Sequence, residues 1–267
     1  MKSYGVTETD SEESDLSCHL NNLARNGFTI LKSGFSGSDI ENIAMMVNKT
    51  HAEYLDLYGE NYLISIDEHN TVRAPFLYDP VYLKVSFNEN LMRVVENILK
   101  GNFILNQQNI IINPGGGDRY NQLYWHRDLP YQHFVTSRPI ALNALYCVCD
   151  FTFDNGSTQV LPGSHKMESF PGNRFLEEKK KQFFVPAGDY LLIDSMLYHS
   201  GSINITNTRR IGINNVYSTP IIRRQIDFKL SDFLYDFNVT ESIYKKYLGF
   251  NYTTCSSVSE YLKSRGK

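Results

Sequence analysis

A histidine and an aspartate two residues apart carry the strongest chemical signal in this sequence. His126 and Asp128 lie in the segment YWHRDLP, residues 124–130. Side chains alternate between two faces along an extended segment, so these two would point in the same direction. An imidazole nitrogen and a carboxylate oxygen placed together can ligate a metal ion. Because this spacing also arises by chance, a metal site requires a third ligand from elsewhere in the chain.

His199 is the best candidate for that third ligand. It follows the apolar segment GDYLLIDS, residues 188–195, where a strand is expected to end and a loop to begin. Two histidines and one carboxylate form the facial ligand set of non-haem iron(II) oxygenases. Calcium and magnesium prefer oxygen ligands, whereas zinc could use the same three side chains. The residues alone therefore indicate a metal site without fixing the metal.

Two adjacent arginines could hold an organic acid near that metal. Arg209 and Arg210 follow His199 by ten and eleven residues, at the start of the strand-like segment RIGINNVYSTP. Only one of two successive strand residues can face the interior. A guanidinium pairs with a carboxylate through two parallel hydrogen bonds, so the inward arginine would suit a dicarboxylic acid such as 2-oxoglutarate.

Short strands are expected to position these residues. Turn sequences rich in Gly, Pro, Asn and Asp separate segments rich in β-branched and aromatic residues. No helical pattern lies between these segments, which favours an antiparallel barrel or sandwich over a parallel α/β sheet. The expected strands cover residues 103–113, 141–153, 157–162, 188–195 and 210–220.

Helices are expected on either side of this β core. Apolar residues recur at helical spacing over 39–58, where Ser36 or Ser38 would cap the helix, and over 90–100, which Gly101 would end. Two further helices are expected over 228–247 and 256–265. The acidic residues 1–15 predict a disordered arm. Residues 16–267 are then expected to form one domain, with its β core at about 100–222.

The composition of the chain limits its expected cellular location and the classes of partner it could bind. The 267 residues carry a net charge of −3, which gives no positive field for nucleic acid. Four cysteines are too few for a disulfide framework in a chain of this length. No apolar segment approaches the roughly 18 residues that span a membrane. We expect a cytoplasmic protein without nucleic-acid or membrane partners, whose oligomeric state the sequence does not indicate.

Three segments, taken in order, resemble the phytanoyl-CoA dioxygenase family. They are HRD at 126–128, NGSTQVLPGSHK at 155–166 and HSGSINITNTRR at 199–210. The resemblance covers roughly residues 100–220. It implies a mainly β (α+β) protein with a double-stranded β-helix core, also called a jelly roll or cupin-like fold, and flanking N- and C-terminal helices. It also implies the cofactors Fe(II) and 2-oxoglutarate.

The resemblance also assigns residues. It implies His126, Asp128 and His199 as the metal ligands, and Arg210 rather than Arg209 as the partner of the 2-oxoglutarate carboxylate. Several members of the family carry a serine two residues after the second histidine, which helps to hold this carboxylate. Here that position is Gly201, so the sequence departs from the family pattern at one cofactor contact.

Four further residues are weaker candidates. Gln107 and Asn109 share one face of the expected strand 103–113, and by analogy with the family they would bind the cofactor. Arg127 and Tyr131 lie beside the metal ligands and would contact the substrate.

The resemblance implies a dioxygenase that hydroxylates a small-molecule metabolite with O₂ and releases succinate and CO₂. One alternative keeps the same cofactors but carries out desaturation, cyclisation or alcohol oxidation of a natural-product or sugar intermediate. Another alternative is a non-catalytic binding module on the same fold. Product mass would separate the oxidative outcomes, and cofactor binding would separate an enzyme from a binding module.

Overall fold

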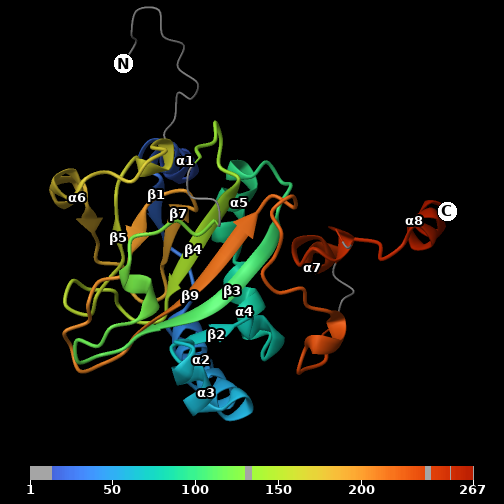
Figure 1. Ribbon diagram of the computed structural model, residues 1–267, viewed down its shortest axis with the longest axis horizontal. Coiled ribbons are helices and arrows are strands. Elements are labelled where there is room, and N and C mark those ends of the chain that lie inside the picture. The colour runs from blue at the N-terminus through green and yellow to red at the C-terminus, as the bar shows by residue number, and fades with distance from the viewer. Residues whose placement is uncertain (1–13, 130–133, 238–241, 253, 267) are drawn as a thin grey trace, which may run out of the picture.

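Two antiparallel sheets form the centre of the protein (Figure 1). The structure, a computed structural model, describes residues 14–129, 134–237, 242–252 and 254–266. The larger sheet has six strands in the order β1-β7-β4-β9-β3-β2. Its strands are β1 (Phe28–Leu31), β2 (Thr71–Arg73), β3 (Ile104–Asn113), β4 (Ala141–Cys147), β7 (Tyr190–Asp194) and β9 (Arg210–Ser218).

The smaller sheet has three short strands in the order β6-β5-β8. They are β5 (Gln159–Val160), β6 (Lys181–Gln182) and β8 (His199–Ser200). An isolated antiparallel bridge joins His126 to His199 at the open edge of β8. The segment that carries the expected HxD pair therefore extends this small sheet. Two antiparallel sheets with the pocket between them form a jelly roll, as the sequence predicted.

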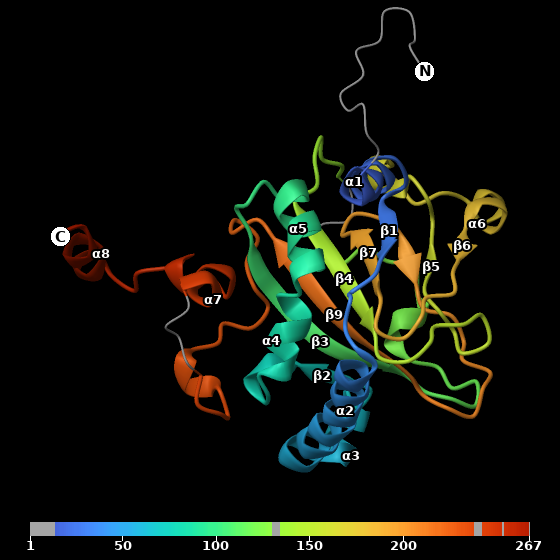
Figure 2. The ribbon, with the colours of Figure 1, turned by 180° about the vertical axis from the view of Figure 1, so that it is seen from behind.

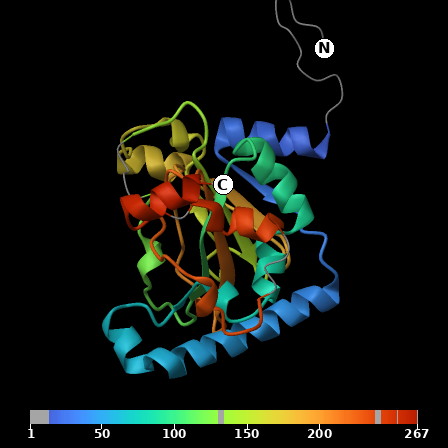
Figure 3. The same ribbon diagram turned by 90° about the vertical axis from the view of Figure 1, so that its right-hand side faces the viewer.

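Helices cover the face of the larger sheet that points away from the smaller one (Figure 2). The N-terminal helices are α1 (Asp15–Asn26), α2 (Gly37–Tyr58), α3 (Glu60–Ser65), α4 (Val81–Ser86) and α5 (Glu89–Ile98). The longest of these, α2, runs along one end of the β core (Figure 3). The later helices are α6 (Asn173–Lys179), α7 (Ser242–Tyr247) and α8 (Val258–Arg265). Short 3₁₀ turns lie at Pro75–Leu77, Asn121–Leu123, Ser164–Lys166, Leu230–Asp232 and Phe250–Tyr252.

Strand alternation divides the larger sheet into an apolar face and a site-facing face. In β4, Ala144 and Tyr146 belong to the core shared with the helices, whereas Leu145 lines the pocket between the sheets. In β9, Ile211 and Ile213 pack into the same core. Because successive strand residues point to opposite faces, the residues between them face the pocket.

The structure confirms two predicted helices closely. Helix α2 begins at Gly37, and Ser36 and Asp39 form a reciprocal capping box at its N-terminus. Helix α5 begins at Glu89 with Asn88 as its N-cap, and the chain leaves it through Lys100 and Gly101, both at positive φ. The 256–265 helix is likewise present as α8.

The prediction of a continuous helix over 228–247 is wrong. The described part of that range contains a 3₁₀ turn at Leu230–Asp232 and the short helix α7. Its aromatic side chains pack against the body and one another instead. Phe228 lies 4.8 Å from Phe76 between ring centroids, and Phe233 stacks on Phe237 at 4.3 Å. Such tertiary contacts outweigh a weak helical pattern.

Most of the predicted N-terminal arm, residues 1–13, lies outside the described residues. Ser14 caps α1, and Asp15 already belongs to that helix. The assignment of residues 16–267 to one domain stays a prediction. Among the described helices, none combines the length and apolar character needed to cross a membrane.

Candidate metal centre

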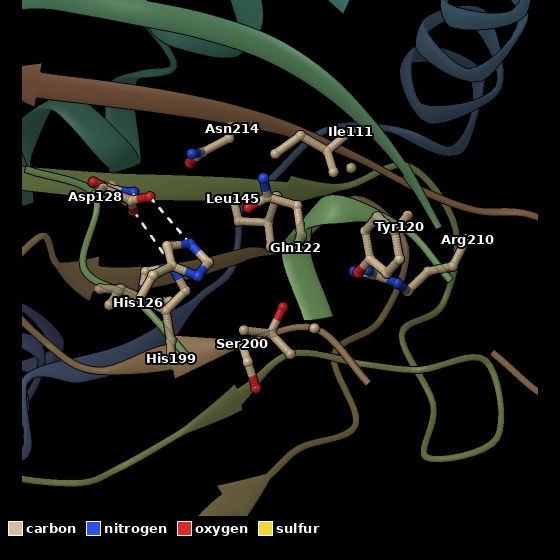
Figure 4. Close-up of a pocket in the computed structure, with 15 residues that line it drawn as sticks. Ile111, Tyr120, Gln122, His126, Asp128, Leu145, His199, Ser200, Arg210 and Asn214 are labelled. Carbon is tan, nitrogen blue, oxygen red and sulfur yellow. Dashed lines mark hydrogen bonds and ion pairs between the residues drawn. The ribbon is translucent and has the colours of Figure 1, made fainter. Parts of the chain in front are cut away.

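Three side chains from two neighbouring segments converge at one point between the sheets (Figure 4). One Asp128 carboxylate oxygen lies 3.6 Å from Nε2 of His126, and the other lies 3.4 Å from Nε2 of His199. All three potential ligand atoms lie within 4.8 Å of one another. The bridge between His126 and His199 sets this distance, because each backbone N–H donates to the carbonyl of the other residue.

Backbone carbonyls fix the orientation of both imidazoles. Nδ1 of His126 lies 2.7 Å from the Tyr124 carbonyl, and Nδ1 of His199 lies 3.0 Å from the Leu197 carbonyl. A carbonyl oxygen only accepts, so each Nδ1 carries the hydrogen and each Nε2 keeps its lone pair. Both lone pairs belong to the nitrogens beside Asp128. Two imidazole nitrogens and a carboxylate fit a divalent transition metal such as iron(II).

The charge states of His199 and Asp128 also suit metal binding. Burial lowers the pKa of His199, and the nearby Asp128 offsets this only in part. Burial raises the pKa of Asp128, but both histidines and Asn143 outweigh this effect and leave it below its usual value. His199 is therefore neutral and Asp128 ionised at neutral pH. Burial lowers the pKa of His126, yet its contacts with Asp128 raise it overall.

A second layer of polar contacts holds the carboxylate. Asn143, on β4, donates from its side-chain amide to Asp128, and the Ser195 hydroxyl donates to the amide oxygen of Asn143. Both residues are almost fully buried. Hydrogen bonds of this kind orient a metal ligand and tune its basicity. Asn143 was not among the residues predicted from the sequence, although an asparagine within the apolar segment ALNALYC was an available signal.

Arg210 lies at the other end of the same pocket. Its guanidinium stacks over the Phe151 ring at 4.3 Å from the centroid, and its Nη2 donates to the Tyr120 hydroxyl over 2.8 Å. The side chain is only 4% exposed. Arg209 points the opposite way and donates to Asn48 on α2 over 3.0 Å. Strand alternation thus directs one arginine inward and the other outward.

The three candidate metal ligands and Arg210 line one pocket. The space free of protein atoms in this pocket is about 510 Å³, which includes the part open to solvent. Apolar side chains of Ile111, Leu145 and Ile193 form part of its wall. Polar groups at the two ends are separated by this apolar wall, so an elongated acid could reach both the ligand cluster and the arginine.

A sequence model of the phytanoyl-CoA dioxygenase (PhyH) family matches residues 23–212, more than half of the chain. The chain belongs to the phytanoyl-CoA dioxygenase family. The residues matched include the ligand cluster, Arg210, the last turn of α1 and the helices α2 to α5. The family resemblance expected from three short segments is therefore confirmed over a much longer range.

Curated relatives match parts of the chain. The uncharacterized protein Rv1501 of Mycobacterium tuberculosis is 26% identical over 174 residues, which cover 64% of this chain and 63% of the relative. The iron/alpha-ketoglutarate-dependent dioxygenase penM of Penicillium thymicola is 32% identical over 89 residues, which cover 31% of this chain and 28% of penM. The chain thus spans less than two thirds of the length of these relatives.

Solved structures share the fold of this PhyH family member. EctD from S. alaskensis, in a crystal structure with 2-oxoglutarate and 5-hydroxyectoine, has a TM-score of 0.67 and 21% identity, covering 85% of this chain and 84% of EctD. The non-heme alpha-ketoglutarate-dependent epimerase SnoN from nogalamycin biosynthesis has a TM-score of 0.56 and 16% identity, covering 77% and 81%. These likenesses confirm the predicted jelly-roll core with flanking helices.

The structure places the two predicted amide residues of this PhyH protein outside the main pocket. Gln107 and Asn109 line a neighbouring hollow with Phe76 and Phe228, and the Asn109 amide donates to Gln107 over 3.3 Å. The amide that lines the main pocket is Asn214, directly across the ladder from Asn109. We therefore do not assign Gln107 and Asn109 to the cofactor.

Arg127 faces away from the ligand cluster. It is 2% exposed and donates to the carbonyls of Ser164, over 2.9 Å, and of Met167. Its guanidinium carbon lies 4.0 Å from the centroid of the Tyr198 ring. Because it alternates with His126 and Asp128, it points to the opposite side of the segment. This placement contradicts the expected substrate contact and indicates a structural role. The other expected substrate residue, Tyr131, lies outside the described residues.

Proposed function

We propose that this protein is an Fe(II)- and 2-oxoglutarate-dependent oxygenase that acts on a small molecule. One observation carries the proposal: His126, Asp128, His199 and Arg210 line a single pocket, with two histidine lone pairs and a carboxylate at one end and a buried guanidinium near the other. The curated relative penM carries iron and alpha-ketoglutarate in its name, and membership of the PhyH family supports the same chemistry.

Different residues of the pocket would bind the metal and the cosubstrate. His126, Asp128 and His199 would hold iron(II), and Arg210 would pair with the distal carboxylate of 2-oxoglutarate. When bound, iron(II) and 2-oxoglutarate supply the oxidation of the substrate by O₂, with succinate and CO₂ as co-products. Asn143 and Ser195 would keep the Asp128 carboxylate oriented toward the centre. Ile111, Leu145 and Ile193 would exclude water from the pocket wall.

Hydroxylation is the favoured outcome, with desaturation, cyclisation and alcohol oxidation as alternatives. Proteins of similar fold include EctD, solved with 5-hydroxyectoine, and the epimerase SnoN. The ligand set is common to all these outcomes, so the fate of the substrate depends on how it is held. The complete set of ligands, together with Arg210, favours an enzyme over a non-catalytic binding module.

A screen for succinate release tests this proposal. The full chain, supplied with iron(II), 2-oxoglutarate and O₂, is incubated with a panel of small metabolites, and substrate-dependent O₂ uptake and product mass are recorded. At least one metabolite should raise succinate release above the uncoupled background. His126→Ala should abolish both basal and stimulated release, whereas His19→Ala, on α1 and outside the pocket, should retain them. Equal succinate release by wild type and His126→Ala would disprove the ligand assignment.

A further inference from the structure

The Tyr120 hydroxyl lies against Arg210 inside the candidate pocket (Figure 4). Tyr120 follows β3 and immediately precedes the 3₁₀ turn at Asn121–Leu123, and only 5% of its surface is exposed. Its hydroxyl oxygen accepts a hydrogen bond from Nη2 of Arg210 over 2.8 Å. The two side chains therefore form one polar end of the pocket, at a distance from the ligand cluster.

Gly201 is what allows the tyrosine ring to reach this position. A Cβ atom at Gly201 would lie 2.0 Å from the Tyr120 hydroxyl oxygen and 3.0 Å from Cζ of the same ring. Real side chains do not approach so closely, so any other residue at 201 would push the ring away. The Gly201 N–H also donates to the Gln122 carbonyl over 2.7 Å, which holds the two segments together. The Tyr120 hydroxyl therefore fills the space that a side chain at position 201 would occupy.

Two donors at this end of the pocket have no acceptor among the residues that the structure describes. The Tyr120 oxygen accepts from Arg210, and within the described part of the chain no acceptor receives its own proton. Nε of Arg210 is buried and likewise lacks a partner among the described residues. Burial raises the pKa of Tyr120, with Arg210 opposing this only in part, so the hydroxyl stays protonated at neutral pH and can donate. Unpaired buried donors are costly and indicate a ligand that accepts hydrogen bonds.

We infer that Tyr120 is a further cosubstrate-binding residue, whose hydroxyl donates to the distal carboxylate of 2-oxoglutarate alongside Arg210. This inference rests on the proposed function, since it concerns the same pocket. A carboxylate has two oxygens, which can accept from the guanidinium and from the phenol at once. The tyrosine thereby supplies the hydroxyl that glycine at position 201 cannot provide.

Anaerobic binding measurements test this role without turnover. The full chain loaded with Fe(II) is titrated with 2-oxoglutarate and, separately, with 2-oxobutyrate, which has the same keto acid group but no distal carboxylate. Tyr120→Phe should raise the Kd for 2-oxoglutarate by about ten- to a hundredfold, as expected for losing a hydrogen bond to a charged group. The Kd for 2-oxobutyrate should not change. Tyr62→Phe, which alters an exposed tyrosine on α3 away from the pocket, serves as the matched control.

Gly201→Ala is a second variant that should disturb the Tyr120 hydroxyl, in this case without altering Tyr120 itself. The added methyl group should displace the Tyr120 ring and weaken 2-oxoglutarate binding while sparing 2-oxobutyrate. Circular dichroism and the melting temperature establish that both variants fold. If Tyr120→Phe binds 2-oxoglutarate as tightly as wild type, the inference is overturned and the proposed function stands. If wild type itself fails to bind 2-oxoglutarate, the proposed function is overturned together with the inference.

Discussion

The two imidazoles of the candidate centre are oriented by the backbone rather than by other side chains. Each Nδ1 faces a carbonyl two residues earlier in the chain, at Tyr124 for His126 and at Leu197 for His199. This contact selects the tautomer in which Nε2 is free to bind a metal. Asp128 depends instead on a side-chain partner, so its orientation is the more sensitive to substitution.

Asn143→Ala should therefore weaken metal binding. The variant removes the amide that donates to Asp128 and also leaves the Ser195 hydroxyl without its acceptor. Loss of such an outer contact typically costs about 10- to 100-fold in metal affinity. Anaerobic titration with Fe(II) measures this change, with Asn97→Ala, an exposed asparagine on α5, as control. Equal Fe(II) affinity in Asn143→Ala and wild type would show that the amide does not support the ligand.

Metal affinity should fall as the pH falls. Protonation of His126 should set the pH at which this fall begins. A metal binds only the neutral imidazole, so protons compete for the ligand. Burial lowers the pKa of His126, but contacts with Asp128 raise it overall, whereas the pKa of His199 is lowered. Competition should thus begin at a higher pH than for a histidine of ordinary pKa, about 6.5. Fe(II) titrations at a series of pH values from neutral downward measure the effect, and a pH-independent Kd would contradict the assignment.

At the scale of elements, the sequence could predict what depends on local periodicity. Extended alternation correctly placed His126 and Asp128 on one side, and helical spacing located α2 and α5. Local periodicity could not predict the bridge between His126 and His199, because it joins segments that are distant in the chain. The contact between Tyr120 and Gly201 was hidden for the same reason.

The substrate contact predicted for Arg127 overlooked the alternation of side chains along its segment. Its neighbours face the pocket, so the residue between them must face the loop at 164–168, where it bonds several carbonyls. The identity of these partners depends on the tertiary arrangement of that loop, which no local pattern reveals. A charged residue beside the candidate metal ligands was therefore interpreted as a substrate contact.

Arg127→Leu should destabilise the protein rather than weaken substrate binding. The substitution leaves buried carbonyl oxygens without their donor, at a cost of about 2–4 kcal/mol in the free energy of unfolding. Chemical denaturation measures this loss. Arg174→Leu is a suitable control because the Arg174 side chain is 94% exposed. Wild-type stability in Arg127→Leu, combined with a higher KM for a substrate, would restore the original interpretation.

At the scale of the whole molecule, the candidate site exists only where the two sheets meet. The larger sheet contributes Asn143 and Arg210, and the smaller sheet contributes His199 and the bridged His126. Helices α1, α2, α4 and α5 bury the opposite face of the larger sheet, which leaves its polar positions directed into the pocket (Figure 2). Residues that line the pocket thus alternate along the same strands with residues that form the core.

Anaerobic addition of Fe(II) and 2-oxoglutarate to the full chain tests the central claim most directly. If His126, Asp128 and His199 hold the metal and Arg210 anchors the acid, the mixture should develop the weak visible charge-transfer band of an iron(II) complex with a chelating 2-oxo acid. His126→Ala should lose the band, and Arg210→Ala should require a much higher 2-oxoglutarate concentration to produce it. Absence of the band in the folded wild-type protein, or its persistence in His126→Ala, would contradict the account.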